Sequence, residues 1–182
     1  CLWVVCVLQT VAKKIENRAQ PEGVGVTVRR SLGGAQLRNL DPFLLLDAFE
    51  SDNPDDYIGG FPSHPHRGFE TVTYLLAGRM RHKDNAGNEG VIEPGGVQWM
   101  TAGKGIIHSE MPEQEEGLMS GFQLWVNLPA EHKMVDPYFT MLWSGGTPRV
   151  VVPDDGGRVT EVMVIAGRFG EPDRQERGGR GE

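Results

Sequence analysis

The segment GGFPSHPHRGFETVTYLLAG, residues 59–78, contains the pattern that decides the fold. His64 and His66 stand two residues apart, and a run of apolar and β-branched residues follows them up to Gly78. In a β-strand, two residues at this spacing point to the same face of the sheet. The segment therefore predicts a strand that directs two imidazoles into one interior.

A second pair with the same spacing lies in GKGIIHSEMP, residues 103–112, where Glu110 follows His108 by two positions. Two such strands across a barrel would bring three imidazoles and one carboxylate together. Because this donor set lacks a thiolate, it suits iron, manganese, copper, nickel or zinc better than calcium or magnesium. Four ligands leave two octahedral positions open, as oxygen-activating non-haem iron sites require and as structural zinc sites normally do not.

A single His-x-His pair can also be a chance feature of the surface, so the metal prediction depends on the two pairs together. Two further histidines, His82 and His132, lie in the polar segments RMRHKDN and PAEHKMVD. For these two we expect solvated roles.

The rest of the chain predicts an all-β domain. It contains 25 glycines and 12 prolines, and turn signals such as DNAGNEG and PDDGG separate its short apolar segments. Many short strands at such spacing are typical of a sandwich or barrel. Within residues 122–128, we expect the face formed by Phe122, Leu124, Val126 and Leu128 to pack on the core. Residues 122–128 belong to a strand candidate over 118–129, and the other strand candidates are residues 25–34, 42–50, 69–78, 90–95, 97–103, 137–142, 149–153 and 160–167.

Composition excludes several classes of protein. The formal charge of −7 and the pI near 5.3 argue against direct nucleic-acid binding, which needs a clustered positive field. The two cysteines, Cys1 and Cys6, cannot build a disulfide framework or a thiolate zinc site, so a reducing intracellular setting fits best. The apolar run over residues 1–8 is too short to span a bilayer, and no membrane association is expected.

The 182 residues are enough for one domain with its own core. Residues 1–20 are expected to be an N-terminal extension, with a marginal helix over 9–17. The domain is expected over residues 21–167. The glycine-rich, charged residues 168–182 are predicted to be a disordered tail.

The chain also resembles the pirin family, which belongs to the cupin superfamily. The similarity extends over about residues 21–167 and is carried by four motifs in order. These are RRSLGGAQLRNLDPFLLLDAF (29–49), GGFPSHPHRGFETVTYLL (59–76), PGGVQWMTAGKGIIHSEMP (94–112) and FQLWVNL (122–128). The resemblance implies a cupin double-stranded β-helix, or jelly roll.

The resemblance also implies roles for two glutamates. A generic cupin would take its metal carboxylate from the position of Glu70, whereas pirins use the position of Glu110. Glu110 is therefore expected to be the fourth ligand and a possible proton acceptor in catalysis. Glu70 is an even number of residues from His64 and His66, so in a regular strand it would point to the same face as they do. It then either orients a ligand imidazole from the second shell or has a structural role. A bulge at Gly68 would turn Glu70 to the other face.

Two functions follow from the resemblance. One is a quercetin 2,3-dioxygenase, in which a metal, expected to be Fe²⁺, binds a flavonol and dioxygen. The other is an iron-dependent nuclear co-regulator that contacts a transcription-factor complex without turnover. Both are compatible with a cytoplasmic or nuclear location. Pirins normally carry two cupin domains, and the sequence after Gly167 does not resemble the second domain.

Overall fold

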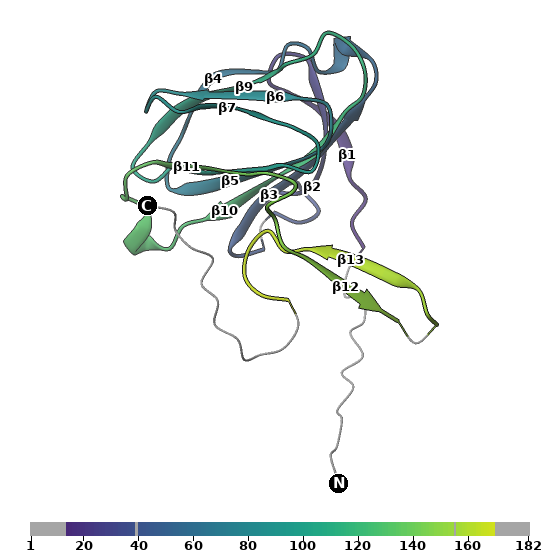
Figure 1. Ribbon diagram of the computed structural model, residues 1–182. Helices are drawn as coiled ribbons and strands as arrows, with labels where there is room; N and C mark the ends of the chain where they lie inside the picture. Colours follow the sequence, from purple (N-terminus) through teal and green to yellow (C-terminus); the bar gives the residue numbers. More distant parts are fainter. Residues whose placement is uncertain (1–13, 39, 155, 170–182) are drawn as a thin grey trace.

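The computed structural model describes residues 14–38, 40–154 and 156–169, and almost all of its regular structure is β-strand (Figure 1). The strands are β1 Arg18–Glu22, β2 Val26–Leu32, β3 Phe43–Ser51, β4 Phe61–His66, β5 Phe69–Ala77, β6 Met80–Asp84, β7 Glu89–Ile92, β8 Val97–Thr101, β9 Ile106–Pro112, β10 Met119–Asn127, β11 Tyr138–Leu142, β12 Arg149–Pro153 and β13 Val159–Met163. Two short 3-10 helices complete the list: η1 Pro54–Asp56 and η2 Ala130–His132. Among the described residues, no helix has the length and apolar character needed to cross a membrane.

Two antiparallel sheets form the body of the domain. A seven-stranded sheet has the order β1-β2-β3-β10-β5-β8-β11, and a four-stranded sheet has the order β4-β9-β6-β7. The sheets face each other in Figure 1. From β3 to β10 the chain passes repeatedly between them, so that strands distant in sequence become neighbours, as β9 is between β4 and β6. This arrangement confirms the predicted all-β cupin jelly roll.

The core lies between the two sheets. The seven-stranded sheet contributes most of it, and the four-stranded sheet adds Met80 from β6 and Ile92 from β7. Burial of these apolar side chains between the sheets is the main source of stability for such a sandwich. The whole cluster is Val26, Val28, Phe49, Tyr57, Leu75, Met80, Ile92 and Met119.

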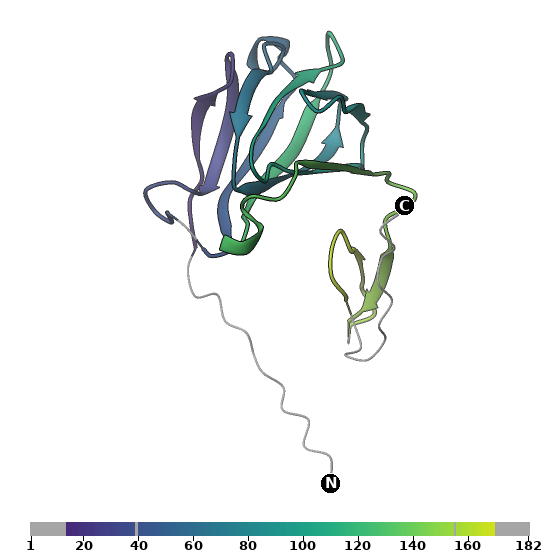
Figure 2. The same ribbon diagram turned by 90° about the vertical axis from the view of Figure 1, so that its left-hand side faces the viewer.

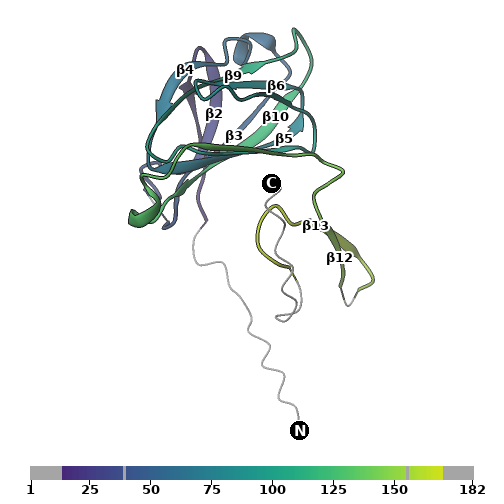
Figure 3. The ribbon, with the colours of Figure 1, turned by 60° about the vertical axis from the view of Figure 1, so that its left-hand side comes forward.

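The edges of the domain differ in detail from the sequence prediction. The first strand begins at Arg18, three positions before the expected start at residue 21, and pairs with β2. Its residues are mostly exposed, so the hydrophobic pattern gives no sign of it. Residues 14–17 form no helix, and the rest of the expected 9–17 helix lies outside the described residues. The hairpin β12–β13 projects away from the two facing sheets (Figures 2 and 3).

Strand β10 presents the opposite face to the interior from the one expected. Gln123 and Trp125 line the internal cavity, whereas Phe122 is 40% exposed. The prediction for this face is therefore wrong for Phe122, and Leu124 and Val126 are only half-buried, whereas Leu128 is buried as expected. The reason is that the interior contains a polar site, and the inward residues of β10 are those that serve it.

Candidate metal centre

Three histidines converge at one end of the interior. His64 and His66 lie on β4, and His108 lies directly opposite His64 on the neighbouring strand β9. Their ligand atoms all lie within 4.8 Å of one another. The two i, i+2 pairs thus place their imidazoles on one face, as the spacing in the sequence predicts.

The hydrogen bonds of His64 define its tautomer. Its Nδ1 lies 2.7 Å from the carbonyl oxygen of Pro62, which can only accept, so Nδ1 carries the proton. The Nε2 atom of neutral His64 therefore holds a lone pair, and it lies 3.0 Å from Nε2 of His66. Two ligands at about 2.1 Å from an ion and at right angles to each other are separated by about 3.0 Å.

The third imidazole has a free nitrogen as well. Nε2 of His108 is buried and has no hydrogen-bond partner. An unpaired buried polar atom is costly, unless a group such as a metal ion occupies the position it faces. The chemistry of these three nitrogens therefore fits a bound metal ion.

The electrostatics of the site keep the rings of His66 and His108 neutral. Burial, together with the charges of the neighbouring His108 and His64, lowers the pKa of His66 to about 4. Burial, followed by the charges of His64 and His82, lowers the pKa of His108 to about 3. At neutral pH both rings are therefore unprotonated bases, which is the form that binds a metal.

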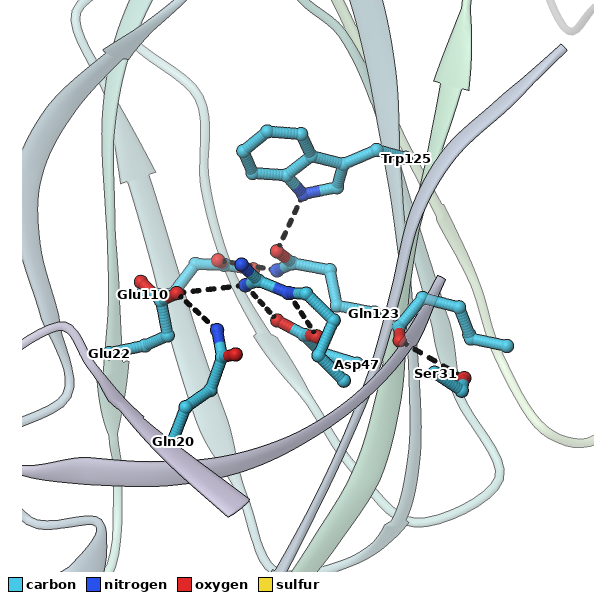
Figure 4. A network of polar contacts seen from close by, with 9 residues as sticks. Gln20, Glu22, Ser31, Asp47, Glu110, Gln123 and Trp125 are labelled. Carbon is cyan, nitrogen blue, oxygen red and sulfur yellow. Dashed lines mark hydrogen bonds and ion pairs between the residues drawn. The ribbon is translucent and has the colours of Figure 1, made fainter. Parts of the chain in front are cut away.

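Glu110 lies on the same face of β9 as His108 and is only 2% exposed. Its Oε1 accepts a hydrogen bond from Oγ1 of Thr73 (3.1 Å), and its Oε2 accepts one from Nε2 of Gln123 (2.8 Å). Figure 4 shows the contact with Gln123, whose own Oε1 accepts from Nε1 of Trp125 (2.9 Å). Glu110 lines the same cavity as His64, but it is not within the 4.8 Å group of three histidines.

Glu70 does not join this group. Gly68 has a φ of +78°, and the chain turns there from β4 in one sheet to β5 in the other. The strand parity of His64 and His66 therefore does not continue to Glu70. Its Oε1 accepts a hydrogen bond of 2.6 Å from Oγ1 of Thr101. Its role, as a second-shell or as a structural carboxylate, stays a prediction.

The sequence prediction missed the residues behind His108. His82 is fully buried on β6, where its Nδ1 lies 3.3 Å from Nδ1 of His108 and its Nε2 lies 3.1 Å from Oδ2 of Asp84. The expected solvated role of His82 is therefore wrong. Residues 80, 82 and 84 are buried and alternate with more exposed residues, as in a strand with one inward face. The sequence does not reveal this alternation by hydrophobicity, because two of the three inward residues are polar. His132 is exposed, as predicted.

The cavity beside the metal centre has a volume of about 600 Å³. One wall carries an ionic group, in which the guanidinium of Arg30 bonds to both carboxylate oxygens of Asp47 (2.8 and 2.6 Å) and to Glu22 (2.9 Å). Figure 4 marks the contacts that Asp47 and Glu22 make in this ionic group with dashed lines. The remaining walls are largely apolar, with residues that include Val28, Leu45, Phe49, Phe61, Met80 and Trp125.

Comparison with known proteins gives consistent results. A sequence model of the family described as Pirin matches residues 25–126. Human pirin is 51% identical over 158 residues, covering 86% of this chain and 51% of the human protein. A pirin-like protein of Caulobacter vibrioides is 56% identical over 160 residues, covering 88% of this chain and 56% of that protein.

Among solved structures, a quercetin 2,3-dioxygenase from Acinetobacter baumannii superimposes with a TM-score of 0.74 at 37% identity. The similarity covers 85% of this chain and 55% of that one. The chain thus spans about half the length of the relatives that it matches.

Proposed function

This chain belongs to the pirin family of cupin proteins, and on that basis we propose that it binds one Fe²⁺ ion and takes part in a quercetin 2,3-dioxygenase reaction. The proposed ligands are His64, His66, His108 and Glu110. The observation that carries the proposal is the convergence of three imidazoles, one of them with an unpaired buried nitrogen, beside a cavity of about 600 Å³. Cavities of this size are typical for small-molecule ligands.

The donor set supports iron among the possible metals. Three imidazoles and a carboxylate leave open positions that a substrate and dioxygen can reach. When bound, the ion would supply a Lewis acid that favours the deprotonated flavonol, together with the redox capacity to use dioxygen. Manganese, copper, nickel and zinc are the alternatives that the same donors accept.

The protein's own residues would handle the proton and the orientation. Glu110 has two carboxylate oxygens at the cavity wall, so one can face the metal while the other accepts the proton of a flavonol hydroxyl. Thr73 and Gln123 donate to those oxygens and fix the carboxylate plane. Gln123 is in turn held by the indole of Trp125, so the orientation of Glu110 depends on the cavity wall itself.

The shape and polarity of the cavity support a flat, hydroxylated aromatic substrate. Trp125 packs edge to face on His66, with ring centroids 5.1 Å apart, and Phe61 adds a second aromatic surface. Such rings can pack on an aromatic ligand. The Arg30–Asp47 pair offers a fixed donor and acceptor to peripheral hydroxyl groups. The apolar remainder of the lining would exclude water.

The direct test is turnover by anaerobically purified, iron-loaded protein after addition of quercetin and air. We expect loss of the flavonol absorption with consumption of one dioxygen per quercetin, and about one metal ion per chain. His108→Ala and Glu110→Gln should abolish turnover, whereas the matched control Glu70→Gln should retain it, because Glu70 contacts Thr101 instead of the metal centre. Protein that contains one iron and binds quercetin without turnover would contradict the enzyme proposal and favour the co-regulator.

A further inference from the structure

A chain of buried polar groups leads away from the metal centre behind His108. It passes through His82 and Asp84 on β6, with Gln98 of β8 beside it. His82 and Gln98 are fully buried, and Asp84 is 8% exposed. Polar groups at this depth are stable only in a defined hydrogen-bond pattern, so the pattern can be followed atom by atom.

Asp84 anchors one end of the chain of contacts. Its Oδ1 accepts hydrogen bonds from the backbone N–H groups of Ala86 and Asn88, both at 2.9 Å. Its Oδ2 accepts from the side-chain amide of Asn88 (2.8 Å) and faces Nε2 of His82 (3.1 Å). Since its neighbours supply donors, Asp84 is an ionised acceptor, and the proton of His82 must be on Nε2.

A proton on Nε2 leaves a lone pair on Nδ1 of neutral His82. The amide Nε2 of Gln98 donates to this Nδ1 at 2.8 Å. The same Nδ1 lies 3.3 Å from Nδ1 of His108, so His108 must carry its own proton on Nδ1. Nε2 of His108 then holds a lone pair, and this is the buried nitrogen that has no partner. The ring of His82 is also fixed in place, because Phe139 stacks on it with centroids 4.4 Å apart and planes 18° apart.

We propose that Asp84 and His82 are positioning residues that select the tautomer of His108, so that its Nε2 lone pair is directed at the metal. The inference rests on the proposed metal site and extends it. Metal-binding histidines commonly donate their second N–H to a carboxylate or carbonyl group, which fixes the tautomer and strengthens the ligand. Here the imidazole of His82 lies between the carboxylate of Asp84 and the ligand His108. The position of the proton on His82 therefore determines the position of the proton on His108.

The substitution Asp84→Asn tests this relay. An asparagine amide can donate to Nε2 of His82, which would move the His82 proton to Nδ1 and the His108 proton to Nε2. We expect metal affinity, measured by competition with a chelator for Fe²⁺ or Zn²⁺, to fall about 10- to 100-fold. In metal-free protein with ¹⁵N-labelled histidine, long-range ¹H–¹⁵N correlation spectra should show His108 protonated on Nδ1 in the wild type and on Nε2 in Asp84→Asn.

The chain offers a matched control in Asp154. Its Oδ1 accepts from the N–H groups of Gly156 and Arg158, the same i+2 and i+4 pattern as in the turn after Asp84, but in the β12–β13 hairpin. Asp154→Asn should therefore reproduce any effect of weakening such a turn and leave metal affinity within about twofold of the wild type.

The two measurements separate the relay from the metal site. A wild-type spectrum with the His108 proton on Nε2 would overturn the relay, and this result needs no variant to fold. Unchanged affinity and unchanged tautomer in Asp84→Asn would also overturn it. Wild-type protein that shows the expected tautomer but binds no metal would instead contradict the proposed function. The expected tautomer together with a selective loss of affinity in Asp84→Asn would support the relay.

Discussion

Replacing Arg30 by methionine should destabilise the fold strongly, because it leaves a buried carboxylate without its partner. The guanidinium and the Asp47 carboxylate form two parallel hydrogen bonds, and their side chains are only 17% and 9% exposed. Loss of one partner of a buried ion pair costs about 3–5 kcal/mol. Since the pair borders an open cavity, we expect about 3 kcal/mol, equivalent to a roughly 100-fold larger unfolding constant.

Urea unfolding of metal-free protein, followed by tryptophan fluorescence, measures this change without the contribution of metal binding. The double variant Arg30→Met/Asp47→Leu should recover most of the loss, since it leaves no buried unpaired ion. Glu22, the other carboxylate bonded to Arg30, has a side chain that is 37% exposed. The exposed pair Arg158–Asp154 is the control: its side chains are 87% and 39% exposed, and Arg158→Met should leave the free energy of unfolding nearly unchanged. A cost below about 1 kcal/mol for Arg30→Met, or a double variant as unstable as the single one, would refute the reasoning.

Three further outcomes are expected. Glu110→Gln should lower metal affinity in chelator competition by more than about 100-fold, with little change in the stability of the metal-free protein, because the amide keeps hydrogen-bonding capacity but loses the charge. Burial lowers the pKa of His66 to about 4 and that of His108 to about 3, so the unfolded chain binds more protons below about pH 6.5. The free energy of unfolding of metal-free protein, measured with urea, should be highest above that pH and should decrease as the pH falls toward 4 and then 3. In His108→Ala this free energy should depend less on pH. Fe²⁺ at a hundredfold excess over its dissociation constant should stabilise the fold by about 2.7 kcal/mol, and His64→Ala should remove the resulting rise in melting temperature.

The part of the site that the sequence predicts is the part that depends on local geometry. His64 and His66 share a strand face because of the two-residue period of a β-strand, and His108 reaches them because β9 pairs with β4. Pairing between strands 40 residues apart is a property of the whole fold, and only the resemblance to cupins makes it predictable. Glu70 illustrates the limit, because a single glycine at position 68 with positive φ ends the periodicity from which its role was inferred.

The residues that the sequence prediction missed are polar groups on the inner faces of strands. Hydrophobic alternation identifies a strand by its apolar side. The segment of β6, in which His82 and Asp84 point inward, is therefore not recognised as a strand, and a solvated role is expected for His82. For the same reason the apolar face of β10 is assigned to the core, although Gln123 faces the cavity. In a barrel built around a polar centre, the inward face of a strand near that centre carries the polar residues.

The two sheets contribute different parts of the site. The strands β4, β9 and β6 of the smaller sheet carry the three histidines, Glu110 and the proposed relay. The larger sheet carries Gln123 and the Arg30–Asp47 pair, which face the cavity from the opposite side. Among the contacts described, none joins the Arg30–Asp47 pair directly to the three histidines or to Glu110. Substitutions in this pair should therefore change substrate preference while metal affinity stays the same. If the two sheets divide these tasks, substitutions in β2 and β3 would change which substrate a protein with this fold accepts, and the metal centre would stay the same.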